Sequence, residues 1–139
     1  MGPIKNLKRK LRNAWVTLNA VSVNLWLDDV REAPKGWYWA VDCAEAEDVL
    51  SSFHINEMSL DHDLGACKRC IGSYCFNVRG CICSCHKTGY DFCLHMALTG
   101  LWPRFRPTVH SQNPVGIANM RAVIDRYGKY IKYFKIILS

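Results

Sequence analysis

The chain has 139 residues, of which half are hydrophobic and 22% are charged, and its net charge is +6. This length and composition predict one soluble globular domain with a sizeable core. No apolar run is long enough to span a bilayer and no secretory signal is visible, so we expect a cytoplasmic protein that needs neither a membrane nor an obligate protein partner.

Most of the positive charge lies in residues 1–20, a basic extension that precedes the domain predicted over residues 21–139. Residues 1–20 contain five basic residues and no acidic one, so the other 119 residues carry only +1. Apolar residues recur there at helical spacing and predict an amphipathic helix: Ile4, Leu7, Leu11, Ala14, Trp15 and Leu18. Its surface could contact a membrane, nucleic acid or an organelle import system. It could also be an appended helix with a solvated basic face, which is the commoner case.

The chain after Val21 alternates between predicted strands and predicted helices. Apolar runs predict strands within residues 21–31, 36–43, 55–65, 106–113 and 130–138, although the last run could also continue a helix. The first of these strands ends at Asp28 and Asp29, and the third ends at Asp61. Helical spacing covers residues 44–53, 88–102 and 114–128. Strands that alternate with helices predict a parallel α/β sheet with three layers.

Acidic and imidazole side chains follow several of the predicted strands. Because the carboxyl ends of parallel strands form a ligand crevice at one edge of the sheet, we expect these side chains to converge there. They are Asp28, Asp29, Asp61, His62, Asp63, His110 and Ser111.

Three of these acids form the oxygen-rich set that a hard cation needs. We expect Asp28, Asp29 and Asp61 to bind Mg²⁺ or Mn²⁺, since such ions prefer carboxylate oxygens. An aspartate could instead cap a following helix, which would account for one of the three.

The two histidines at the strand ends suit proton transfer. The unperturbed imidazole pKa lies near neutrality, so His62 and His110 are the candidate general base and general acid, and Asp61 or Asp63 could orient one ring. The candidate phosphate-binding residues lie beside them: Arg31, Ser111, Asn113 and Gly116 at the start of the last predicted helix.

Six of the eight cysteines lie between Cys67 and Cys85, in a segment that we interpret as a loop inserted over residues 66–87. Close cysteine pairs without a secretory signal favour a structural zinc site over a disulfide scaffold. The predicted zinc ligands are Cys67, Cys70, Cys83 and Cys85, with His86 or Cys81 as a substitute. Reactive thiols without a metal are the alternative.

Other chemically notable residues are given structural roles. Cys43 and Cys93 are predicted to be small buried hydrophobic residues, and His54 and His95 to be structural. The aromatic segment 37–39 is predicted to belong to the core and its rim, unless it lines the crevice and stacks on a nucleobase.

Four motifs, in this order, resemble the cyclic-phosphate processing receiver-like domain: LWLDDVREAPKGW, SLDHDLG, TGYDF and TVHSQNPVGIANM. The resemblance covers residues 23–126 and implies a receiver-like (flavodoxin-like) fold that acts on cyclic phosphates, such as the 2′,3′-cyclic ends of damaged RNA. It also implies that Asp28, Asp29 and Asp61 occupy the positions of the receiver carboxylates, and that Ser111 occupies the receiver hydroxyl position.

The sequence departs from a phosphorelay receiver in ways that favour acid–base chemistry. His62 and His110 are additions that phosphorylation of an aspartate does not need, and the usual receiver lysine after the fifth strand has no clear counterpart. We therefore expect a metal-assisted phosphoesterase that acts on a nucleotide or an RNA end. The alternatives are a receiver-like module that binds a nucleotide without turnover and, less favoured, a phosphorelay receiver with Asp61 as the phosphate acceptor.

Overall fold

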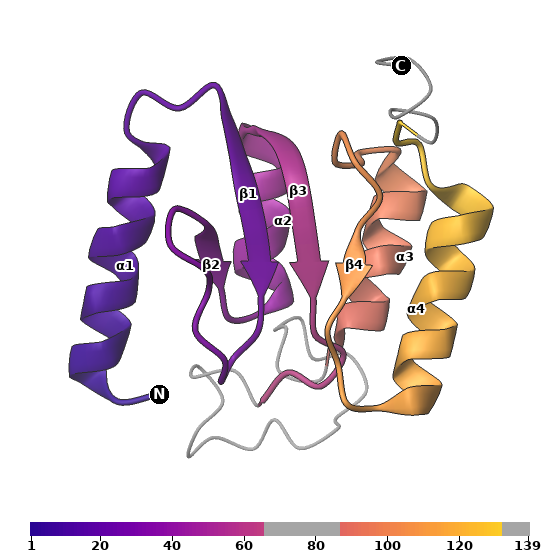
Figure 1. Ribbon diagram of the computed structural model, residues 1–139, viewed down its shortest axis with the longest axis horizontal. Helices are drawn as coiled ribbons and strands as arrows, with labels where there is room; N and C mark the ends of the chain where they lie inside the picture. Colours follow the sequence, from indigo (N-terminus) through magenta and orange to yellow (C-terminus); the bar gives the residue numbers. More distant parts are fainter. Residues whose placement is uncertain (66–86, 132–139) are drawn as a thin grey trace.

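The computed structural model describes residues 1–65 and 87–131, and within them the chain forms a four-stranded parallel sheet (Figure 1). The strands stand in the order β2-β1-β3-β4. Their bounds are Ser22–Leu27 for β1, Tyr38–Ala40 for β2, His54–Leu60 for β3 and Thr108–Val109 for β4. The first four predicted strands are thus confirmed, although β4 has only two residues. Residues 132–139, which hold most of the fifth predicted strand, lie outside the described part.

Four helices accompany the sheet, and their ends carry the expected signals. Their bounds are Pro3–Thr17 for α1, Cys43–Ser52 for α2, Gly89–Thr99 for α3 and Pro114–Tyr127 for α4. Thr88 and Asp91 form a reciprocal capping box at the start of α3, and Gly100 ends that helix in the left-handed conformation that glycine tolerates best. No helix in the described ranges is long and apolar enough to cross a membrane.

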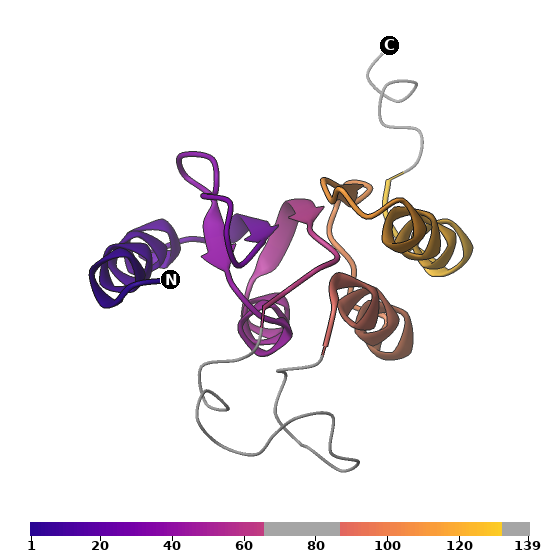
Figure 2. The ribbon, with the colours of Figure 1, turned by 90° about the horizontal axis from the view of Figure 1, so that it is seen from below.

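The helices are not distributed over two faces as the three-layer prediction requires. Viewed along the strands, α2 and α3 lie on one face of the sheet, α1 lies beyond β2 at one end, and α4 lies at the β4 end (Figure 2). None of the four described helices covers the opposite face. The physical reason is local: residues 28–37, which join β1 to β2, form turns and carry no helical apolar pattern.

The core lies between the sheet and α2, α3 and α4. Alternate residues of β1 are buried on the helix side, namely Val23, Leu25 and Leu27, while Asn24 and Trp26 point to the other face and are half-buried. This period of two is typical of a sheet covered on one side, because successive side chains point to opposite faces. The helices contribute side chains that are fully buried: Phe92, Met96, Met120 and Ile124.

Helix α1 covers the free edge of β2 through polar contacts. The side-chain amide of Asn13 accepts a hydrogen bond from the Trp39 main-chain N–H and donates one to its carbonyl, both at 2.8 Å. The guanidinium of Arg9 also donates to the Trp39 carbonyl and makes a bidentate ion pair with Glu45 at 2.6 and 3.0 Å. Asn13 therefore takes the place of a neighbouring strand, which protects an edge that could otherwise pair with another chain.

The ion pair between buried Arg9 and half-buried Glu45 generates a prediction for stability. Arg9→Met should lower the free energy of unfolding by about 2–4 kcal/mol, because it leaves the Glu45 carboxylate without its guanidinium partner and removes one of the two side-chain donors to the Trp39 carbonyl. Chemical denaturation measures the change. Lys10→Met, on the exposed side of the same helix, is the matched control and should change stability by less than about 0.5 kcal/mol. An equal loss in both variants would contradict the anchoring role of Arg9.

Candidate active site

Three residues that follow different strands are held side by side by the hydrogen-bond ladder of the sheet. The ladder continues one residue past the strand ends: the Asp28 N–H donates to Ala40, the Asp61 N–H to Leu27, and the His110 N–H to Leu60, at distances of 2.8 to 3.0 Å. Because Leu27, Leu60 and Val109 are in register, Asp28, Asp61 and His110 form the next row across the sheet. The predicted convergence at the carboxyl edge is therefore present in the structure.

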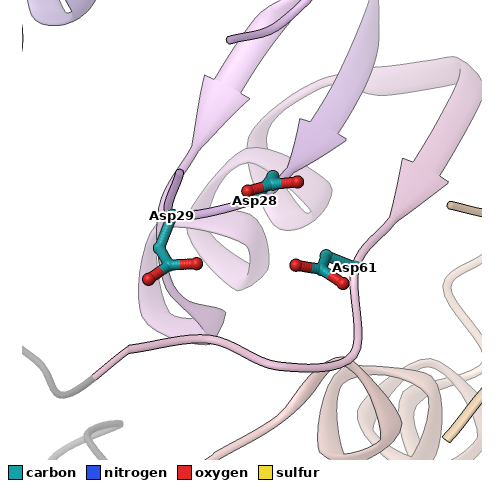
Figure 3. Close-up of side chains that lie close together, drawn as sticks. All are labelled: Asp28, Asp29 and Asp61. Atoms are coloured by element: carbon teal, nitrogen blue, oxygen red, sulfur yellow. The ribbon is translucent and has the colours of Figure 1, made fainter. Parts of the chain in front are cut away.

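Three carboxylates gather at this edge. One oxygen from each of Asp28, Asp29 and Asp61 lies within 4.8 Å of the others, and the side chains of Asp29 and Asp61 face each other below Asp28 (Figure 3). Asp29 is positioned by the Gly65 N–H, which donates to its Oδ2 at 2.9 Å. Oxygen donors at this spacing suit one hard divalent cation, which takes several carboxylate oxygens as ligands.

Asp28 is fully buried and already holds several hydrogen bonds. Its Oδ1 accepts from the main-chain N–H groups of Val30 at 2.8 Å and Arg31 at 2.7 Å, which closes a turn directly after β1. Its Oδ2 lies 3.0 Å from Nε2 of His110. No helix follows in residues 28–37, so the turn, and not a helix N-cap, is the local structural role of Asp28.

The His110 ring reaches across β3 to meet residues of β1. It stacks on the Trp26 ring with centroids 3.9 Å apart and an interplanar angle of 6°. Its Nδ1 lies 2.7 Å from the Ser59 hydroxyl, which also accepts a hydrogen bond from Thr108 at 2.9 Å. Trp26, Ser59 and Thr108 are paired in register, and the small Ser59 leaves room above β3 for the two rings. Both ring nitrogens of His110 are therefore bonded within the protein.

His62 lies against the first turn of α4. Its Nδ1 is 2.9 Å from Asp63 Oδ1, and a Cβ added at Gly116 would overlap the imidazole ring. Asn113 caps α4 by accepting the Gly116 N–H at 3.0 Å, and its amide also approaches Asp63 at 3.4 Å. Asp63 therefore favours the tautomer in which Nδ1 carries the proton and Nε2 is the nitrogen that can exchange one.

Two further candidate residues border the acids. The Arg31 guanidinium donates to the His110 carbonyl and lies 4.0 Å from the Asp28 carboxylate. The Ser111 hydroxyl acts to lower the pKa of Asp61 and accepts the Asn113 N–H at 3.1 Å. Both residues are thus near the acidic cluster, but each already has partners within the protein.

The two buried acids have opposite pKa shifts. Burial acts to raise the pKa of Asp28, but hydrogen bonds from His110 and from the Arg31 and Val30 amides outweigh it and hold the pKa below its ordinary value. Burial raises the pKa of Asp61, and the neighbouring charge of Asp28 raises it further. The ionised form is therefore favoured for Asp28 and disfavoured for Asp61, because Asp28 accepts more hydrogen bonds and Asp61 has a charged neighbour.

Three supporting residues had no assigned role in the sequence analysis. Trp26, Ser59 and Thr108 lie two residues before Asp28, Asp61 and His110 on the same face, so the period-two spacing of strands was an available signal for all three. For Trp39, which was predicted to belong to the core and its rim, no local signal indicated that its indole N–H donates to the Asp28 carbonyl at 2.6 Å. Trp39 is buried and Trp37 packs edge-on against Trp26 at 6.3 Å.

The remaining cysteine and histidine predictions fall into two groups. Cys43 and Cys93 are fully buried, and burial raises the pKa of each thiol to about 12, as expected of inert core residues. His54 is exposed, and His95 is half-buried with its ring 3.5 Å from Glu47. The predicted zinc ligands Cys67, Cys70, Cys83 and Cys85, with the substitutes Cys81 and His86, lie outside the described residues.

Comparison with known protein families places most of the chain. A family model described as the cyclic-phosphate processing receiver domain matches residues 23–126. No curated protein and no solved structure matches the chain. The matched range begins within β1 and ends within α4, and it contains every acid and histidine of the site.

The raised pKa of Asp61 generates a prediction with a defined sign. A carboxylate that is disfavoured in the folded protein makes stability fall as the pH rises from the ordinary aspartate pKa through the raised one. Asp61→Asn should therefore be more stable than the wild type at pH 7 without divalent ions, and the difference should disappear below about pH 4. Thermal unfolding across this pH range measures both effects.

The same variant tests the cation site. Adding Mg²⁺ or Mn²⁺ should raise the melting temperature of the wild type but not that of Asp61→Asn, because an ion that binds only the folded state stabilises it. Asp48→Asn, an exposed substitution on α2, is the control and should respond to the ions like the wild type. An Asp61→Asn variant less stable than the wild type at neutral pH would contradict the repulsion between Asp28 and Asp61.

Proposed function

This chain belongs to the cyclic-phosphate processing receiver family, and we propose that it is a metal-assisted phosphoesterase acting on the cyclic phosphate of a nucleotide or an RNA end. We favour 2′,3′-cyclic phosphates as substrates. The observation that carries the proposal is the row of Asp28, Asp61 and His110 at one sheet edge, with Asp29 completing a set of carboxylate oxygens within 4.8 Å.

The acids are the proposed ligands of a catalytic Mg²⁺ or Mn²⁺. Asp29 and Asp61 are the main candidates, because Asp28 Oδ1 is already occupied by two amides and only its Oδ2 has a lone pair to spare. When bound, such an ion supplies positive charge that offsets the charge of the phosphoryl oxygens in the transition state.

His62 is the proposed proton-transfer residue. Its contact with Asp63 keeps the Nδ1 proton in place and leaves Nε2 to act. In hydrolysis of a cyclic phosphate, water adds to phosphorus, one phosphorus–oxygen bond of the ring breaks, and the released ribose oxygen takes a proton. Nε2 of His62 can accept the proton of the water or deliver the proton to the leaving oxygen.

His110 receives a different role from the one its sequence position suggests. Because its two ring nitrogens contact Asp28 and Ser59, we assign it to holding the Asp28 carboxylate rather than to a second proton transfer. Arg31, Ser111 and the start of α4 with Asn113 and Gly116 remain the proposed phosphate-binding groups. Arg31 lies beside Asp28 and Ser111 beside Asp61, and α4 begins next to His62, where a helix amino end favours an anion.

A substrate panel tests this function. The wild type should hydrolyse 2′,3′-cyclic mononucleotides in the presence of Mg²⁺ or Mn²⁺, with 3′,5′-cyclic and cyclic dinucleotide phosphates as comparisons. His62→Ala should lower kcat about 100-fold or more, because general acid–base catalysis contributes that much. His110→Ala should lower kcat about tenfold and raise the metal concentration needed for half-maximal activity, because it frees the Asp28 carboxylate.

Controls separate the alternatives. His95→Ala, which removes a half-buried histidine outside the site, should leave kcat unchanged. Saturable nucleotide binding with no product under any metal condition would select the non-catalytic binding module. Uptake of a phosphoryl group at Asp61 from a phosphodonor would select a phosphorelay receiver. Full activity of both His62→Ala and His110→Ala would remove the proposed mechanism.

For the cysteine-rich segment we propose a structural zinc ion held by Cys67, Cys70, Cys83 and Cys85, with His86 or Cys81 as a substitute. The support is the spacing of the cysteines in the sequence, since paired thiolates are the ligands that structural zinc prefers. Elemental analysis of the purified protein should find one zinc per chain, and Cys67→Ser with Cys70→Ser should abolish it. A zinc content near zero in the wild type would end the proposal.

A further inference from the structure

Helix α1 presents its apolar side to solvent. Five large apolar side chains, four along one face of the helix and the last at its C-cap, are between 57% and 77% exposed: Ile4, Leu7, Leu11, Trp15 and Leu18. We call this set the α1 apolar stripe. Its members recur every three to four residues, so they form a continuous band about 20 Å long. No described residue covers this band.

The contacts of the opposite face fix this orientation. Arg9 and Asn13 are only 3% and 5% exposed, and they bind the edge of β2 and Glu45. Turning the stripe inward would expose these groups and lose their hydrogen bonds. The helix is therefore amphipathic with its polar side toward the domain, which is the reverse of an ordinary surface helix. A stable domain rarely leaves a contiguous apolar band of this size without a partner.

The charge around the stripe identifies the kind of partner. At 3.6 residues per turn, Lys8 borders the stripe on one side and Lys10 on the other, and both are exposed. Residues 1–20 contain no acid. The partner should therefore combine an apolar interior with a negatively charged surface.

We infer that α1 docks on the surface of an anionic lipid bilayer. The stripe would enter the boundary between headgroups and acyl chains, and the flanking lysines would contact negative headgroups, which is how a basic amphipathic helix lies in a membrane interface. Nucleic acid would satisfy the lysines but not the stripe. A second copy of this chain would satisfy the stripe but would bring lysines from two acid-free helices together.

The position of α1 permits docking while the active site stays open. It is the outermost element at the β2 end of the sheet, and the carboxyl ends of β1 and β3 point past it to a different edge of the molecule (Figure 1). Docking needs no transmembrane helix and no turnover. It goes beyond the sequence expectation, which favoured a solvated basic face and no membrane contact, because only the structure turns the apolar side outward.

Vesicle co-sedimentation of the full chain tests the proposal. The wild type should bind vesicles of equimolar phosphatidylserine and phosphatidylcholine, and should not bind vesicles of phosphatidylcholine alone. Leu7→Ser with Leu11→Ser, and separately Lys8→Glu with Lys10→Glu, should weaken binding roughly tenfold or more, because the first pair removes apolar area from the stripe and the second reverses the charge beside it. Trp15→Phe should keep binding but lose the blue shift of fluorescence on vesicle addition.

The controls make each outcome decisive. Leu98→Ser removes a side chain that is 88% exposed on α3 and should bind vesicles like the wild type. The stripe residues are exposed, so circular dichroism should show that all variants fold. Equal binding to neutral and anionic vesicles, or binding that the stripe variants do not alter, would overturn the proposal. It would also be overturned by a lipid-free dimer that Leu7→Ser with Leu11→Ser converts to a monomer, because a second copy would then cover the stripe.

Discussion

The site depends on the main-chain ladder that continues one residue beyond the ends of three parallel strands. These main-chain hydrogen bonds hold the backbones of Asp28, Asp61 and His110 in one row, independently of the side chains. The pleat then turns all three side chains toward the same face, because residues two apart on a strand share a face. The small Ser59 in the preceding row lets the Trp26 and His110 rings lie over β3. A shift of one residue in any strand would send one of these side chains into the core.

The two buried acids show how one residue type receives two roles from its surroundings. Asp28 is surrounded by donors from its own turn and from His110, which keep it charged although it is fully buried. Asp61 has fewer donors and a charged neighbour, which makes its ionised form unfavourable. A carboxylate that the protein satisfies can serve as a fixed negative point, whereas one that it leaves unsatisfied gains most from a cation. Because of this difference, Asp28 and Asp61 cannot exchange roles in the proposed site.

Helix α1 is anchored by polar contacts, whereas the other helices are anchored by apolar packing. The other helices bury apolar side chains such as Phe92 and Ile124 against the sheet, whereas α1 is held by Arg9 and Asn13 at an exposed strand edge. An edge strand offers N–H and carbonyl groups, so a polar face is the better match for it than an apolar one. The apolar face of α1 is left for another surface. The anchoring of the helix and the exposure of the stripe are thus two consequences of the same contact.

Within the described residues, the sequence by itself determined the four strands, the helices with several of their end signals, and the placement of acids and histidines after strands. These features depend on local periodicity and on short-range signals such as Pro114 and Gly100. It also carried the family, since four motifs keep their order. Only the tertiary structure decided which side of α1 faces outward, that residues 28–37 carry no helix, that Ser59 and Trp26 position His110, and that Asp28 and Asp61 differ in pKa. These properties arise from contacts between residues far apart in the chain, and periodicity within one segment cannot report which partner a face will meet.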